Sequence, residues 1–143
     1  MTVLVELRSV SKHFGKADTR VDALKSVDLS LEAGQVIGLL GPSGSGKSSL
    51  LNVIGAIIEP SSGWIRLDDE VVYDGRWLCR DLRRLRLDKI GFIFQFHNLI
   101  PFLNVLDNVL VVLSLAGWKP AAARARAMEL LDYLGVGDRC RSM

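Results

Sequence analysis

The chain has 143 residues, which suits one domain or part of one. Hydrophobic residues make up 49% of it and charged residues 24%, so it can bury a core and is not intrinsically disordered. Its 18 basic and 16 acidic side chains nearly balance, which leaves no electrostatic reason to expect nucleic acid as a partner. The two cysteines, Cys79 and Cys140, fit neither a disulfide framework nor a zinc site and indicate a reducing compartment.

The sequence predicts neither a signal peptide nor a membrane span. The first ten residues, "MTVLVELRSV", lack the basic start and long apolar stretch of a signal peptide. The longest apolar run, at 109–118, is too short to span a bilayer. We therefore expect a cytoplasmic protein whose membrane contact goes through a partner.

Strand patterns dominate the first forty residues. Residues 3–14 and 21–34 alternate apolar and polar side chains, which predicts two half-buried strands in an antiparallel layer. The segment 35–41, "QVIGLLG", is apolar almost throughout and predicts a strand buried on both faces of a parallel sheet. Leucines and isoleucines at helical spacing over 47–57 then predict an amphipathic helix.

The rest of the chain alternates between strand and helix patterns. Residues 64–75 predict short strands with a turn at Asp74–Gly75, and 90–95, "IGFIFQ", predict a second buried strand. An apolar helix is expected over 104–117. Pro120 opens another helix, which Gly135 ends.

Residues 41–48 read G-P-S-G-S-G-K-S, a full match to the phosphate-binding pattern G-x-x-x-x-G-K-[ST]. Backbone N–H groups can surround a triphosphate only where side chains are absent and positive φ is allowed, which favours glycine. Lys47 would reach the outer phosphates, and the Ser48 hydroxyl is a hard oxygen ligand for Mg²⁺. The motif alone does not distinguish ATPases, GTPases and kinases.

Three further segments resemble the nucleotide-binding subunit of ABC transporters. "GPSGSGKSSLLNVIGAIIEPSSGWIRLDD" is similar to that family's phosphate loop and the turn after it, and "IGFIFQFHNLIPFLNVLDNV" to its glutamine loop. "SKHFG" stands where the family places an aromatic side chain for the adenine ring. The resemblance covers about residues 4–139. The residues around the glutamine loop are most similar to those of the subgroup that powers lipoprotein release and macrolide export.

The resemblance implies an α/β fold of the P-loop NTPase class, an ABC-type ATPase core. An N-terminal antiparallel β-subdomain and the P-loop core would occupy about residues 1–95. The start of the helical subdomain would occupy about 96–143. Residues 1–143 would thus form an incomplete nucleotide-binding domain.

The same resemblance implies ATP and Mg²⁺ as ligands. Gln95 would be the catalytic glutamine-loop residue and would join Ser48 in holding Mg²⁺, while Phe14 would stack on adenine with help from Val21. The implied ATP-binding residues are Phe14, Gly41, Pro42, Ser43, Gly44, Ser45, Gly46, Lys47, Ser48 and Ser49.

The implied partners are a transmembrane permease and a second nucleotide-binding subunit in a head-to-tail dimer, with no nucleic acid. The permease would contact the region after Gln95, where Phe96, Leu99 and Phe102 crowd an apolar surface. Packing within the helical subdomain would explain the same apolar residues equally well. The protein would lie in the cytoplasm, peripheral on the inner face of the cell membrane.

Several motifs that the family uses for hydrolysis do not follow Gln95 in these residues. They are the Walker B acid, the Leu-Ser-Gly-Gly-Gln-like signature and the switch histidine. We therefore expect an N-terminal portion of an ABC-type ATPase, shortened either in the gene or as a fragment, that binds MgATP but does not hydrolyse it alone. The alternative is an ABC-type subunit with a cell-division or regulatory role. A GTPase is disfavoured because the Asn-Lys-x-Asp element is absent.

Overall fold

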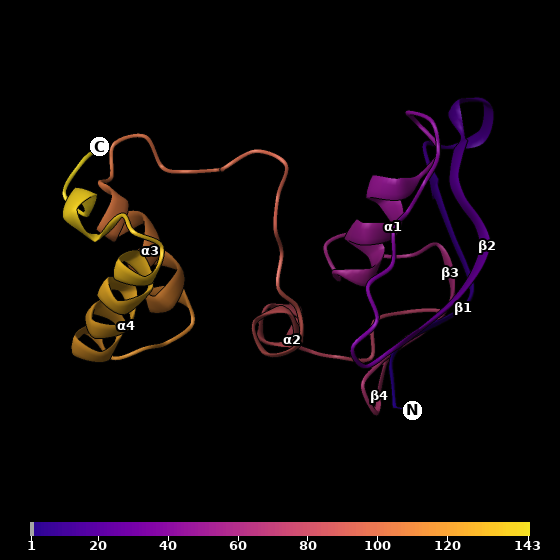
Figure 1. Cartoon of the computed structure of the whole chain (residues 1–143). Helices are drawn as coiled ribbons and strands as arrows, with labels where there is room; N and C mark the ends of the chain where they lie inside the picture. The colour runs from indigo at the N-terminus through magenta and orange to yellow at the C-terminus, as the bar shows by residue number, and fades with distance from the viewer. Residues whose placement is uncertain (1) are drawn as a thin grey trace. The chain divides into compact units, whose positions relative to one another are not determined.

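The computed structural model describes residues 2–143, which divide into two compact units at Phe92 and Ile93. The first unit contains a sheet and two helices, and the second is helical (Figure 1). In chain order the elements are β1 (Val3–Phe14), η1 (Ala17–Thr19), β2 (Val21–Glu32), α1 (Lys47–Ile54), β3 (Ser62–Leu67), β4 (Glu70–Asp74), α2 (Leu82–Lys89), α3 (Val105–Leu115), α4 (Pro120–Tyr133) and η2 (Gly137–Arg139).

The sheet of the first unit is antiparallel throughout, with the strand order β2-β1-β3-β4. Strand β1 is central, and its Leu7 pairs with Leu29 on β2 and with Ile65 on β3. Because side chains alternate along a strand, one face of this sheet is apolar and the other is wet. The antiparallel layer predicted from the alternating pattern is therefore confirmed.

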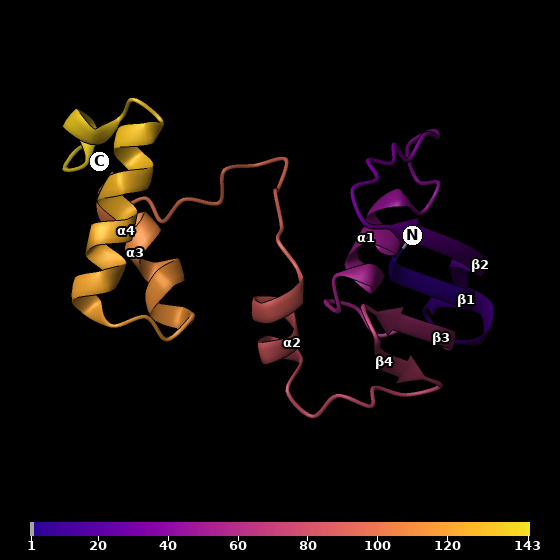
Figure 2. The ribbon, with the colours of Figure 1, turned by 60° about the horizontal axis from the view of Figure 1, so that its bottom comes forward.

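Helix α1 covers the apolar face of this sheet (Figure 1 and Figure 2). Leu50 and Val53 of the helix are buried in one core with Leu7, Val10 and Ile65 of the strands. Burial of this kind stabilises a fold by about 25 cal/mol for each Å² of apolar surface removed from water. This packing fixes the N-terminus of α1 close to β2 and so positions the loop that precedes it.

Helix α2 was not predicted from the sequence as an element of its own. Asp81 caps it by accepting a hydrogen bond from the Arg84 amide at 2.9 Å, and its buried side chain is Leu85. Arg86 then donates to the carbonyl oxygen of Ala56 at 2.8 Å, and Lys89 pairs with Asp68. The helix has only eight residues, and five of them are charged, so it lacks the long amphipathic pattern by which a helix is recognised in a sequence.

Two predicted strands are wrong, those at 35–41 and 90–95. Residues 35–41 have no regular secondary structure, and the side chains of Val36 and Leu40 are almost fully exposed. Residues 90–95 are also irregular, and Ile93 is fully exposed. A parallel strand needs hydrogen-bonding neighbours, and within residues 2–143 no strand pairs with either segment.

The predicted turn at Asp74–Gly75 is present, and a second turn that was not predicted connects β3 and β4. These strands are joined by a turn at Asp68–Asp69, where Asp68 adopts the left-handed conformation with φ 50°. The expected turn at Asp74–Gly75 comes after β4, where Gly75 has φ 64° and Tyr73 bridges to Trp77.

The second unit is a helical hairpin in which α3 and α4 run side by side in opposite directions (Figure 1 and Figure 2). Its core contains Leu106 from α3 with Ala127 and Leu131 from α4. The Asn104 side chain caps α3 by accepting from the Asp107 amide at 2.8 Å, and Pro120 occupies the first turn of α4. Both helices were predicted. Among residues 2–143, no helix has the length and apolarity to cross a membrane.

Candidate functional site

The loop at 41–46 connects the sheet to α1 and belongs to the first unit. Gly46 is the N-cap of α1 in the left-handed conformation, with φ 90° and ψ 1°, and Lys47 is the first helical residue. The Ser45 amide donates to the Pro42 carbonyl at 3.3 Å, which closes the loop into a turn. The helix amides that lack partners within the helix therefore face the loop, where a negative group would be stabilised.

Two glycines of this loop leave little room for a β-carbon, and the restriction is stricter at Gly46, where the neighbour is backbone. At Gly46 a β-carbon would fall onto the carbonyl oxygen of Ala23, so β2 passes too close for a side chain. At Gly41, which has φ 153°, a β-carbon would lie 2.8 Å from the Ser45 Oγ atom. The spacing of the motif therefore reflects both backbone conformation and close approach.

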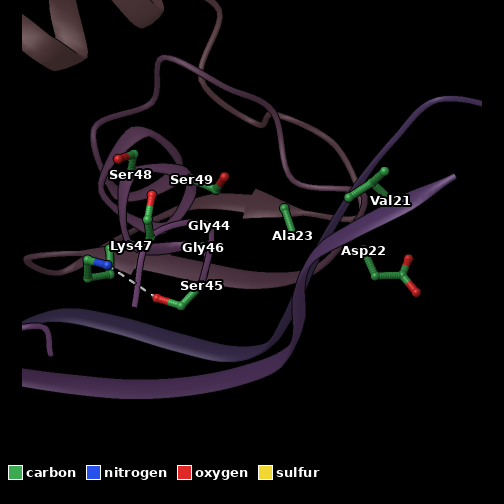
Figure 3. Close-up of a pocket in the computed structure, with 10 residues that line it drawn as sticks. Val21, Asp22, Ala23, Gly44, Ser45, Gly46, Lys47, Ser48 and Ser49 are labelled. Atoms are coloured by element: carbon green, nitrogen blue, oxygen red, sulfur yellow. Dashed lines mark hydrogen bonds between the residues drawn. The ribbon is translucent and has the colours of Figure 1, made fainter. Parts of the chain in front are cut away.

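Lys47 folds back over the loop that precedes it. Its Nζ atom donates to the carbonyl oxygens of Gly41 at 2.8 Å and Pro42 at 2.7 Å. It also donates to the Ser45 Oγ atom at 3.3 Å, the contact drawn as a dashed line in Figure 3. The loop thus holds one positive charge at its centre, next to the positive end of a helix.

A cavity of about 510 Å³ opens between this loop and the start of β2 (Figure 3). One wall is formed by residues 43–49, which include the hydroxyls of Ser48 and Ser49, and the other by Val21, Asp22 and Ala23. Arg20 donates a 2.8 Å hydrogen bond to Asp22, and this bond holds the pKa of the Asp22 carboxyl below its ordinary value. The cavity therefore has a cationic end at Lys47, and the Asp22 carboxylate at its other end is ion-paired with Arg20.

The predicted adenine-stacking residue lies on the strand next to that cavity. Phe14 ends β1 and pairs in register with Val21, which lines the cavity. Its side chain is 42% exposed, and the Lys12 Nζ atom lies 5.0 Å from the centre of its ring. The structure thus brings Phe14 to the same hairpin that borders the phosphate loop.

Gln95 does not belong to the same compact unit as the phosphate loop. It lies in the second unit, which begins at Ile93, whereas the phosphate loop and Phe14 lie in the first. Its role beside Ser48 therefore stays a prediction. Asp22 and Ala23 were not predicted as cavity residues, because only the hairpin register and the close approach to Gly46 bring them to the loop.

A lysine-centred, glycine-rich loop at the N-terminus of a helix defines a P-loop nucleotide-binding protein, here with an antiparallel sheet beside the loop. Residues 24–143 match the family described as ABC transporter. The chain belongs to the ABC transporter family.

Named relatives agree with this family. The chain is 42% identical over 137 residues to the macrolide export ATP-binding/permease protein MacB of Marinobacter nauticus, covering 95% of this chain and 21% of that protein. It is 41% identical over 139 residues to the lipoprotein-releasing system ATP-binding protein LolD of Geobacter metallireducens, covering 97% of this chain and 61% of that protein. The chain therefore spans about three fifths of LolD and one fifth of MacB.

Solved structures show the same fold. The dimeric ATP-binding cassette MJ0796 in a post-hydrolysis state, bound to ADP and Pi, superimposes with a TM-score of 0.81 at 35% identity. The match covers 96% of this chain and 60% of that one. These findings confirm the α/β ATPase-core fold and the predicted resemblance to the lipoprotein-release and macrolide-export subgroup.

Proposed function

We propose that this chain is the ATP-binding portion of a nucleotide-binding subunit that drives a membrane transporter of the ABC family. The observation that carries the proposal is the lysine-centred loop at the N-terminus of α1, in which Lys47, Gly41 and Pro42 are joined by hydrogen bonds of 2.7–2.8 Å. The residues proposed to bind ATP are Phe14, Gly41, Pro42, Ser43, Gly44, Ser45, Gly46, Lys47, Ser48 and Ser49.

The loop fits a triphosphate in shape and in charge. Gly41, Gly44 and Gly46 all have positive φ, which lets successive amides face one centre. Lys47 can exchange its bonds to loop carbonyls for bonds to phosphate oxygens without leaving the loop. The first turn of α1 adds a partial positive charge of about half a unit.

A bound Mg²⁺ would neutralise phosphate charge, and the residues proposed to hold it are Ser48 and Gln95. The Ser48 hydroxyl lines the cavity beside Lys47, as a hard oxygen ligand should. The proposed role of Gln95 rests on the sequence resemblance to the glutamine loop.

The second unit is proposed to be the start of the helical subdomain, which contacts the permease. Phe96, Leu99 and Phe102 are 72%, 59% and 76% exposed, although aromatic and aliphatic side chains of this size usually avoid water. Such an apolar surface beside Gln95 supports a docking role. The proposed second partner is another nucleotide-binding subunit, in keeping with the dimeric cassette MJ0796.

In the assembled transporter the subunit is proposed to hydrolyse ATP while attached to the inner face of the cell membrane. The 143 residues alone are proposed to bind MgATP without turning it over. On α4 the carboxylate of Glu129 forms an exposed ion pair with Arg126 at 2.7 Å, outside the unit that contains the phosphate loop. Transport itself would therefore require the partners.

Titration calorimetry of the 143-residue chain with MgATP tests the binding function. Lys47→Ala should lower the affinity about tenfold or more, because a charge-assisted hydrogen bond contributes a few kcal/mol. Lys25→Ala, which removes an exposed lysine of β2 outside the loop, is the matched control and should bind like the wild type. Equal affinities for the wild type and Lys47→Ala would overturn the proposal.

A further inference from the structure

Lys12 makes two contacts that the phosphate loop does not explain. It lies two residues before Phe14 on β1, so the two side chains share one face of the strand. Its Nζ atom lies 5.0 Å from the centre of the Phe14 ring, within the range of a cation–π interaction. The same atom donates a 2.7 Å hydrogen bond to the Glu59 carbonyl oxygen.

The carbonyl that holds Lys12 belongs to a well-anchored segment. Pro60, the next residue, accepts a 3.0 Å hydrogen bond from the hydroxyl of Tyr73, a buried side chain. The amide of Ser61 donates to the Ser11 carbonyl at 2.8 Å. The Lys12 ammonium is therefore anchored by the Glu59 carbonyl while it also lies over the Phe14 ring.

The proposed function places the base of a bound nucleotide near Phe14. The cavity extends from the phosphate loop to Val21, and Val21 pairs in register with Phe14. A nucleotide with its phosphates at Lys47 would thus direct its base toward the β1–β2 hairpin. Lys12 covers one face of the ring, and the 42% of Phe14 that is exposed leaves surface for the base.

We infer that Lys12 is a positioning residue for the nucleotide base and acts through Phe14. The ammonium fixes the plane of the ring and draws its π electrons toward one face. The other face then offers a less negative surface to an electron-rich purine. This inference rests on the proposed function, since it concerns the base of the nucleotide whose phosphates the loop would bind.

The test separates the base from the phosphates by comparing MgATP with magnesium tripolyphosphate, which has no base. Calorimetry on the 143-residue chain should show that Lys12→Met, which keeps the length and loses the charge, weakens MgATP about two- to fivefold, as for a partly exposed cation–π contact. Its tripolyphosphate affinity should equal that of the wild type. Lys12→Arg should restore MgATP affinity, because a guanidinium also lies over aromatic rings.

A double-mutant cycle shows whether Lys12 acts through Phe14. In the Phe14→Ala background, Lys12→Met should produce no further loss of MgATP affinity. An equal loss in that background would overturn the inference, as would equal losses for MgATP and tripolyphosphate or no loss for Lys12→Met. Unchanged tripolyphosphate binding also shows that a weakened variant is folded.

The same binding measurements distinguish failure of the proposed function from failure of the role of Lys12. If the wild type binds neither MgATP nor tripolyphosphate, phosphate binding fails and the positioning role fails with it. If Lys47→Ala loses both compounds while Lys12→Met matches the wild type on both, the function stands and only the role of Lys12 is refuted.

Discussion

The carbonyl oxygen of Ala23 lies against the α-carbon of Gly46, in the space that a side chain at residue 46 would occupy. This contact joins β2 to the N-terminus of α1 at the point where the phosphate loop ends. The loop is thus braced by the sheet as well as by its own turn.

Gly46→Ala should therefore be more damaging than an ordinary glycine substitution. Gly34→Ala is the matched control, since Gly34 has φ 81° and open space where a β-carbon would stand. Left-handed strain should cost each variant about 1–2 kcal/mol in the free energy of unfolding. Gly46→Ala should lose more, together with its MgATP affinity, in urea titration and calorimetry. Identical behaviour of the two variants would show that the Ala23 contact is unimportant.

Ser48→Ala should weaken nucleotide binding only when Mg²⁺ is present. The hydroxyl is proposed as a metal ligand, so its loss should lower MgATP affinity on the order of tenfold, or about 1.4 kcal/mol. Ser48→Thr keeps a hydroxyl and serves as the control. Calorimetry with Mg²⁺ and with a chelator makes the comparison, and an equal loss under both conditions would argue against the metal role.

Removal of the ring at residue 14 should cost about 1–3 kcal/mol of ATP affinity, the range for a base stacked on an aromatic side chain. Phe14→Tyr and Phe14→Trp should bind nearly as well as the wild type because both keep a flat face. Phe102→Ala, which removes an exposed aromatic of the second unit, is the control. If Phe14→Ala binds like the wild type, the base lies elsewhere.

The sequence predicted correctly those elements whose backbone hydrogen bonds are made within one helix or between neighbouring strands. The β1–β2 hairpin has its alternation in the sequence, and α3 and α4 have Asn104 and Pro120 at their starts. The phosphate loop was predictable because its chemistry needs particular residues at fixed spacing.

The features that the sequence analysis predicted wrongly or missed depend on contacts between residues that are distant in the sequence. Residues 35–41 look like a buried strand, yet a strand depends on neighbours that residues 2–143 do not provide. Asp22 and Ala23 reach the cavity only through the register of β1 with β2. The amphipathic prediction for 47–57 rested on leucines and isoleucines, yet in α1 Leu51 is 54% exposed while Val53 is fully buried.

Phosphate release by the 143-residue chain should not exceed that of a Lys47→Ala control. The chain offers phosphate ligands but no acid that we can assign to positioning water, and hydrolysis requires that water to be oriented. A coupled phosphate assay over several hours makes the measurement. Steady, Lys47-dependent release would refute the expectation and make Glu129 and Asp132 the first residues to substitute.

The stability of the first unit should fall in acid because of Glu6. Arg66 and then Arg8 donate hydrogen bonds to its carboxylate, each at 2.8 Å, and they hold the pKa of Glu6 below its ordinary value of 4.5. A lowered pKa stabilises the fold above pH 4.5, and this contribution is lost as the pH falls below 4.5 through the pKa of the folded state. Urea midpoints across that range should fall less steeply for Glu6→Gln. Arg66→Met, which removes the leading donor, should weaken the dependence in the same way.

Val36 and Leu40 are almost fully exposed. Whether a polar substitution at either residue lowers stability therefore depends on whether the segment is in solvent or packed in a sheet. With Val36 already in water, Val36→Ser removes no packing from the first unit and should improve solubility. Were the same segment paired within a covered parallel sheet, the loss of that buried side chain would cost about 1.5–3 kcal/mol. Residue 36 can therefore serve as a reporter of sheet completion, since one mutation distinguishes a segment in solvent from a segment in a core.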